Sequence, residues 1–191
     1  VVSVLSTGFV AILLPRQEKE PSAADGLPVS SGKVFRESWF LAALVIGGLL
    51  QATHAAFYGF GTLFWVNAGI DEFAIGGLWA IGVVAEIGLF FVAKRLSLKA
   101  GPLQFMMIAA AGSILRWVIF PFATELWQAA ALQVLHGLSF GAAHLGSVAF
   151  LAKVVPQKWS ATGQGLLSTS SGILLAIGLA VCGPLYELDP A

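Results

Sequence analysis

Five acidic or basic side chains lie within long apolar stretches of this sequence, namely His54, Glu86, Arg116, His136 and His144. A charge near the middle of a bilayer costs at least about 2.5 to 3.5 kcal/mol on insertion scales, so such a side chain is expected to face protein or water. A sheltered carboxylate can load and release a proton, and histidine titrates near neutrality. These residue types therefore predict proton binding within a membrane.

Two polar stripes accompany these charges on otherwise apolar helices. The first stripe is Gln51, His54 and Tyr58, and the second is Gln133, His136, Phe140 and His144. Spacings of three and four residues place the first set on one helical face, and at 100° per residue the second set falls within about 80°. Such stripes line a bundle interior or a water-filled path, or they form hydrogen bonds between helices. Both stripes are therefore candidates for cavity lining.

The depth of each charge follows from its distance along the helix, at about 1.5 Å per residue from the external end. Glu86 is then about 20 Å deep, His136 about 15 Å, and Arg116 within about 10 Å of the external face. Arg116 is too far out to pair directly with Glu86, although its long side chain can reach toward His136. We expect Glu86, Arg116 and His136 to serve proton coupling or substrate binding, with purely structural burial as the alternative.

An intramembrane enzyme that uses these histidines and Glu86 as metal ligands or acid-base groups is a further alternative. The sequence contains no HExxH pair, serine elbow or phosphate-binding loop to support it. The prediction is therefore a protein that is not an enzyme and that has no metal site or cofactor.

The composition of the chain fits lipid as its solvent. Of 191 residues, 58% are hydrophobic and 10% are charged, with a mean hydropathy of +0.87. A soluble domain of this size needs more charge on its surface. The formal net charge is zero, which gives no electrostatic basis for a nucleic-acid partner. The prediction is a membrane protein.

Five apolar runs are each long enough to cross a bilayer as a tilted helix. They cover residues 39–64, 73–93, 103–122, 126–151 and 165–185, approximately. No segment shows the alternating pattern of a membrane barrel. The predicted fold is all-α, a polytopic transmembrane helix bundle at 38–191. Residues 1–14 are apolar but span only about 21 Å as a helix, which predicts a truncated transmembrane helix, and 15–37 predict a flexible linker.

Basic residues fall in alternate loops of this arrangement. Nine of the ten Lys and Arg are in such loops: Arg16, Lys19, Lys33, Arg36, Lys94, Arg95, Lys99, Lys153 and Lys158. The intervening loops carry only acidic charge. By the positive-inside rule, the linker 15–37 and the loops 94–101 and 152–164 are predicted to be cytoplasmic.

Three short motifs carry a family resemblance. They are Leu115-Arg-Trp117, the run from Leu135 to His144, and Gln164-Gly165. With these motifs, and over nearly its whole length, the chain resembles the second half of a major facilitator, from the end of helix 6 to helix 11. The branch it resembles contains lactose permease and the phenylpropionate and nucleoside proton symporters.

The resemblance implies a secondary active transporter of the bacterial inner membrane. In this branch a Glu of helix 8, an Arg of helix 9 and a His of helix 10 serve substrate binding and proton coupling, and these roles would fall on Glu86, Arg116 and His136. Lactose permease has a carboxylate three residues after that His, where this chain has Ser139.

The implied activity is proton-coupled symport of a small organic solute, such as an aromatic carboxylate, by alternating access. Its partners would be the solute, protons, the lipid bilayer and the missing N-terminal half. A facilitator-like sensor or accessory membrane protein that binds a solute without moving it is the alternative.

Labelling of introduced cysteines tests the predicted orientation. In full-length protein whose native Cys182 is replaced, a cysteine in the linker 15–37 should be protected from a membrane-impermeant thiol reagent in intact cells. A cysteine at Asp71 should react under the same conditions. The reverse pattern would place the linker outside and overturn the orientation.

Overall fold

Every element in the described part of the chain is a helix. The computed structural model describes residues 33–97 and 101–188, and these ranges contain no strand. Five helical segments there are long and apolar enough to cross a membrane. The predicted all-α transmembrane bundle is thus confirmed. The truncated helix expected at 1–14 and most of the linker 15–37 lie outside the described residues.

Two of the five spans are interrupted. After the short helix η1 (Lys33–Arg36), the first span consists of α2 (Ser38–Ala52) and α3 (Ala55–Asn67). The second is α4 (Glu72–Ser97), and the third is α5 (Pro102–Ile119), which η2 (Phe120–Phe122) extends. The fourth consists of α6 (Leu126–His136), the π-helical turn η3 (Gly137–Gly141) and α7 (Ala142–Val154). Helix η4 (Gln157–Trp159) then leads into the fifth, α8 (Ser160–Leu188).

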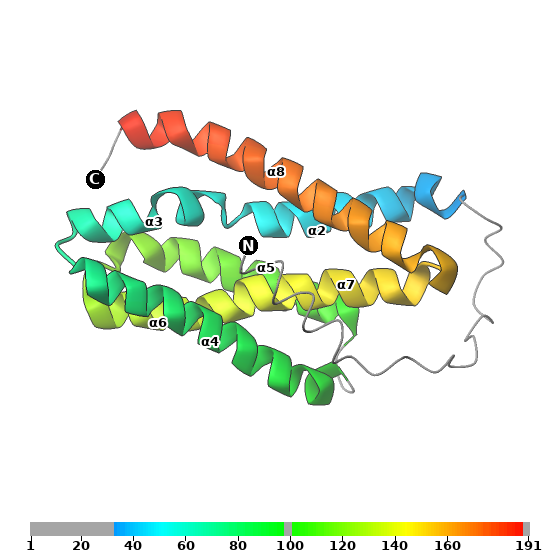
Figure 1. Ribbon diagram of the computed structural model, residues 1–191, viewed down its shortest axis with the longest axis horizontal. Helices are drawn as coiled ribbons and strands as arrows, with labels where there is room; N and C mark the ends of the chain where they lie inside the picture. Colours follow the sequence, from blue (N-terminus) through cyan, green and yellow to red (C-terminus); the bar gives the residue numbers. More distant parts are fainter. Residues whose placement is uncertain (1–32, 98–100, 189–191) are drawn as a thin grey trace, which may run out of the picture.

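The spans run up and down and form one bundle (Figure 1). Helix α8 lies along α2 and α3, α5 lies along α7, and α4 lies along α6 and η3. One end of the bundle holds η1, η4 and the C-terminal ends of α4 and α7, with the basic residues Lys33, Arg36, Arg95, Lys153 and Lys158. The opposite end holds Asp71, Glu72, Glu125 and Glu187.

Side chains and a glycine shape the helix ends. Asp71 Oδ1 accepts hydrogen bonds from the N–H groups of Phe73 (3.0 Å) and Ala74 (3.3 Å) at the start of α4. Gly69 has a φ of 83°, a left-handed conformation that lets the chain turn from α3 into α4. These contacts satisfy backbone groups that a helix end leaves without partners.

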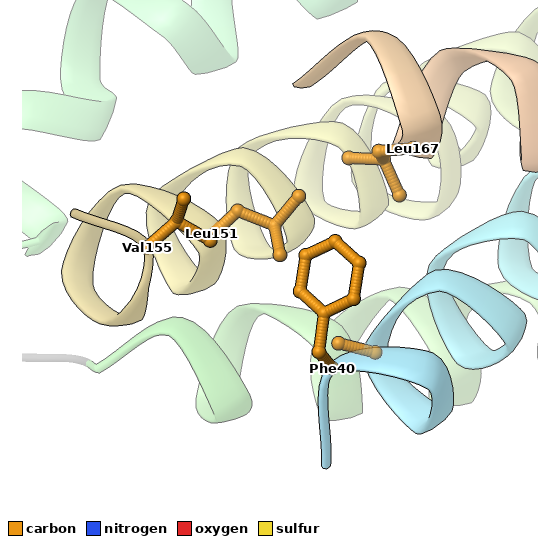
Figure 2. Close-up of a cluster of buried hydrophobic side chains, with 5 residues drawn as sticks. Phe40, Leu151, Val155 and Leu167 are labelled. Carbon is orange, nitrogen blue, oxygen red and sulfur yellow. The ribbon is translucent and has the colours of Figure 1, made fainter. Parts of the chain in front are cut away.

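Apolar side chains from three spans form a buried cluster of Phe40, Ala43, Leu151, Val155 and Leu167. Figure 2 shows the Phe40 ring of α2 pointing toward Leu151 of α7 and Leu167 of α8. Large apolar side chains also cover the outer surface, as at Val84 and Phe91 of α4, which are 67% and 82% exposed. An apolar exterior on an all-helical bundle is suited to lipid, because helices satisfy their own backbone hydrogen bonds.

Helix α4 approaches η3 closely at Gly137. A Cβ atom at that position would lie 2.9 Å from the carbonyl carbon of Ala85, so a side chain there would push backbone against backbone. By contrast, a Cβ atom at Gly88 of α4 would meet nothing within 4 Å. Gly137 therefore sets the distance between the second and fourth spans.

The variant Gly137→Ala should destabilise the bundle, because overpacking that moves backbone typically costs about 1 to 3 kcal/mol. The midpoint of thermal unfolding of full-length protein in detergent measures this effect. Gly88→Ala is the matched control and should leave the midpoint unchanged or slightly higher. Equal midpoints for the two variants would contradict the close packing of α4 against η3.

Candidate functional site

The first span breaks at Thr53 and His54, which frees backbone carbonyls at mid-span. Thr53 Oγ1 donates to the carbonyl of Leu50 (2.7 Å), and the N–H of His54 donates to the carbonyl of Gln51 (3.1 Å). The indole Nε1 of Trp117, from α5, donates to the carbonyl of Thr53 (2.9 Å). Buried backbone groups without partners are costly in a membrane, so these donors stabilise the break as a regular part of the fold.

The fourth span has its own irregularity, the π-helical turn η3, and the two irregular segments meet. Ser139 of η3 is fully buried, and its hydroxyl donates to the carbonyl of His136 (3.1 Å). The same hydroxyl lies 3.3 Å from Nε2 of His54, which is also fully buried. Because π-helical turns are frequent at functional sites, this contact marks the centre of a candidate site.

Glu86 and His136 form the acid–base pair of the site. Glu86 Oε1 of α4 lies 3.1 Å from His136 Nε2 of α6, with side-chain exposures of 19% for Glu86 and 5% for His136. The rings of His136 and His54 lie edge to face, with centroids 5.2 Å apart. A chain of contacts thus runs from Glu86 through His136 to His54 and Ser139, and it joins three spans.

Arg116 is 1% exposed, and none of its guanidinium nitrogens has a hydrogen-bond partner among the described residues. Its Cζ lies 5.0 Å from the ring centre of Phe57 and 5.1 Å from that of Trp117. The ring of Phe57 also lies 5.5 Å from that of His136, so Phe57 contacts both basic side chains. A desolvated cation–π contact contributes about 2 kcal/mol, whereas burial of an ion costs several kcal/mol, so the aromatic rings offset the burial only in part.

Most of the other predicted residues surround this centre. Tyr58 and Phe140 both place their rings near those of His54 and His136, and Phe140 stacks on His136 at 5.5 Å. Gln133 is fully buried against Gly82 with no hydrogen-bond partner in the described chain, and Gln51 is half-buried. Tyr58, Phe140 and Gln133 therefore lie close to His136.

The second polar stripe does not continue to His144. That residue is exposed, and its ring lies 6.5 Å from Phe90 rather than near His136. A stripe at 100° per residue assumes a regular α-helix, and η3 interrupts the helix between His136 and His144. The side chain of Arg116 was also expected to reach toward His136, but its guanidinium lies over the ring of Phe57.

Phe57 and Thr53 are site residues that the sequence did not reveal. The helix break at Thr53 has no proline or glycine from residue 49 to residue 58 to announce it. Phe57 is one of 14 phenylalanines, so nothing in the sequence distinguishes it. The sequence did contain one indication that Trp117 belongs to the site. Trp117 follows Arg116 directly, and a buried guanidinium favours contact with an aromatic face.

Comparisons with known proteins identify the family of the chain. A family model described as "MFS_1 like family" matches residues 4–191. A protein of Escherichia coli (strain K12) named "Probable 3-phenylpropionic acid transporter" is 31% identical over 160 residues, which are 80% of this chain and 42% of that protein. The "Uncharacterized transporter YwbF" of Bacillus subtilis (strain 168) is 27% identical over 166 residues, 85% of this chain and 42% of that protein. The chain thus spans about two fifths of the length of these relatives, and no solved structure matches it.

Replacement of Arg116 by Met should stabilise the protein, because it removes a buried charge without an acidic partner and keeps most of the packing volume. Exchange of buried ionic groups for apolar ones stabilises by about 1 to 4 kcal/mol in favourable cases, and we expect a value at the lower end. Denaturant or thermal unfolding of full-length protein provides the measurement. Arg36→Met, an exposed change in η1, should stay within about 0.5 kcal/mol. A destabilised Arg116→Met would mean that the guanidinium pairs with an acid outside the described residues.

Proposed function

The chain belongs to the MFS_1 like family, and on that basis we propose that it is part of a secondary active transporter that moves a small organic solute together with protons. Transport would proceed by alternating access, in which two helix bundles rock about a site near the middle of the membrane. This half supplies one bundle, and an N-terminal half supplies the other. The protein would reside in a bacterial inner membrane, with the basic end of the bundle in the cytoplasm.

The contact between Glu86 and His136 carries the proposal. The two groups share a position in the membrane interior, where a net charge is expensive, and together they can hold one proton or two. With one proton the pair is either ionic or a neutral hydrogen bond, and with two protons it is a neutral acid beside an imidazolium. Because this second proton changes the charge of the pair, it biases any motion that alters the surroundings of Glu86.

Aromatic and cationic groups support an aromatic carboxylate as the solute. Tyr58 is 39% exposed, and its ring adjoins those of Phe140 and Trp79, so this face can stack against a planar ring. Arg116 is a buried cation without an acidic partner among the described residues, and a guanidinium matches the geometry of a carboxylate. One relative carries 3-phenylpropionic acid in its name, which is an acid of this class.

A pH-jump uptake screen on full-length protein in vesicles tests the proposal. Aromatic acids, sugars and nucleosides are offered one class at a time, with a proton-sensitive dye outside the vesicles. We expect alkalinisation outside with the aromatic acids only. Binding of a solute without accumulation would support the sensor alternative instead.

The variant Glu86→Gln should lose proton-driven accumulation of the solute by at least about tenfold, because an amide cannot load the second proton. Exchange of labelled for unlabelled solute at equal pH should persist, since exchange requires no net proton movement. Glu72→Gln is the matched control, because Glu72 is an exposed residue at the first turn of the same helix. Unchanged, pH-independent uptake in Glu86→Gln would disprove the role of Glu86 in coupling.

A further inference from the structure

When the ring of His54 is neutral, the groups around it include one hydrogen-bond acceptor more than the available donors can serve. Nδ1 of the ring lies 3.2 Å from the carbonyl of Gln51 and 3.2 Å from Thr53 Oγ1, while Nε2 lies 3.3 Å from Ser139 Oγ. Both residues of the last contact are fully buried, so water does not replace a missing donor there. The distribution of protons among these atoms is therefore restricted.

The contacts of Nδ1 determine that this nitrogen carries a proton. The hydroxyl proton of Thr53 is used in the 2.7 Å hydrogen bond to the carbonyl of Leu50, so Thr53 has none left for the ring. A bare Nδ1 would then face two oxygen lone pairs, those of Thr53 and of the Gln51 carbonyl. The ring must carry its proton on Nδ1 and donate it to Gln51.

The hydroxyl of Ser139 then has one proton for two acceptors. The first acceptor is the carbonyl of His136 at 3.1 Å, and the second is the bare Nε2 of His54 at 3.3 Å. If His54 is neutral, Ser139 can serve only one of them. If His54 carries a second proton, Nε2–H donates to Ser139, Ser139 donates to His136, and every contact has one donor and one acceptor.

We propose that His54 is a second proton-binding residue of this transporter and that the Ser139 hydroxyl is the switch that responds to its charge. The proton comes from hydronium: one O–H bond of the hydronium breaks, a water molecule is released, and an N–H bond forms at the lone pair of Nε2. The O–H group of Ser139 rotates away from Nε2 and toward the carbonyl of His136. This proposal rests on the proposed function for its role in transport.

Charged and titratable groups around the ring make its proton depend on the neighbouring pair. Arg116 of α5 and His136 of α6 both oppose a positive charge on His54, and Tyr58 of its own helix contacts the ring. Glu86 of α4 reaches His54 through His136. Among the described residues, Glu86 is therefore the acid that can balance a proton on either histidine, and the two rings compete for it.

The proposed switch lies between the two irregular segments of the bundle. His54 lies at the break between α2 and α3, and Ser139 lies in η3, which begins directly after His136. When Ser139 donates to Nε2, it ties η3 to the break. When His54 carries the second proton, Nε2–H donates to Ser139, so the link to the break remains with its direction reversed, and Ser139 also donates to the carbonyl of His136 at the end of α6. A proton on His54 thus selects between two hydrogen-bonded arrangements, which is the condition for biasing a conformational equilibrium.

Nuclear magnetic resonance of full-length protein with ¹⁵N-labelled histidine, in lipid nanodiscs, tests the proton positions. The His54 signals are assigned by their absence in His54→Gln. We expect the neutral ring at high pH to carry its proton on Nδ1, and the ring to gain a second proton on titration to acid. In Ser139→Ala the midpoint of that titration should move by about one pH unit or more, and Ser139→Thr should restore it.

Transport assays on the same variants test the role in coupling. Ser139→Ala should keep solute exchange at equal pH within about threefold of wild type and lose proton-driven accumulation by at least about tenfold, and Ser139→Thr should recover it. Ser147→Ala is the matched control, because Ser147 is a buried serine of the same span whose hydroxyl has no hydrogen-bond partner among the described residues. It should leave both activities unchanged.

The outcomes separate this proposal from the proposed function. A neutral ring with its proton on Nε2, or a His54 that gains no second proton down to pH 4, would overturn the switch. So would wild-type accumulation in Ser139→Ala. If wild-type protein moves no solute with protons, yet the histidine titration responds to Ser139 as expected, the transport function fails and the proton switch stands.

Discussion

Hydrocarbon offers no hydrogen bonds, and that constraint explains the most irregular parts of this bundle. Each backbone carbonyl freed within a span must find a donor in the protein. At the break between α2 and α3, Thr53, His54 and the indole of Trp117 provide those donors. A helix that breaks without proline, and has its carbonyls satisfied from another helix, is held in that shape by its neighbours. A motion of α5 would therefore be transmitted to the break.

The buried charged side chains are provided with partners less completely than the backbone carbonyls are. Glu86 is paired with His136, but within residues 33–97 and 101–188 the guanidinium of Arg116 meets the faces of Phe57 and Trp117 and no acid. Aromatic faces compensate a cation only in part, so Arg116 leaves a favourable position for an anion in the bundle. Groups kept in unfavourable surroundings cluster at sites of function, because selection for stability alone would remove them. The proposed role of Arg116, binding of an anionic solute, would account for a guanidinium kept in such surroundings.

The sequence predicted the elements of the fold far better than their irregularities. Helix number and the separation of basic from acidic ends follow from hydropathy and charge, and these properties depend on many residues at once. The sequence identified Glu86 and His136 as candidate site residues, because a charge on either side chain is expensive in lipid and their estimated depths in the membrane are similar. The break at Thr53 and the exposure of His144 were not, since no local residue signals them and the register after η3 depends on tertiary packing.

Ser139 illustrates what a hydroxyl can do that a carboxylate cannot. Lactose permease, which belongs to the branch that the chain resembles, has a carboxylate at this position. A serine carries no charge, so it adds nothing to the cost of the buried site, but it has one proton and can direct it to either of two acceptors. The acid of this half is then left to Glu86 on α4, and the responding group lies on η3. In the proposed switch His54 takes the proton and Ser139 rotates, and the 3.3 Å contact between Nε2 and the Ser139 hydroxyl links the two. His136 joins Glu86 to the same serine, because its ring contacts Glu86 and its carbonyl accepts from Ser139.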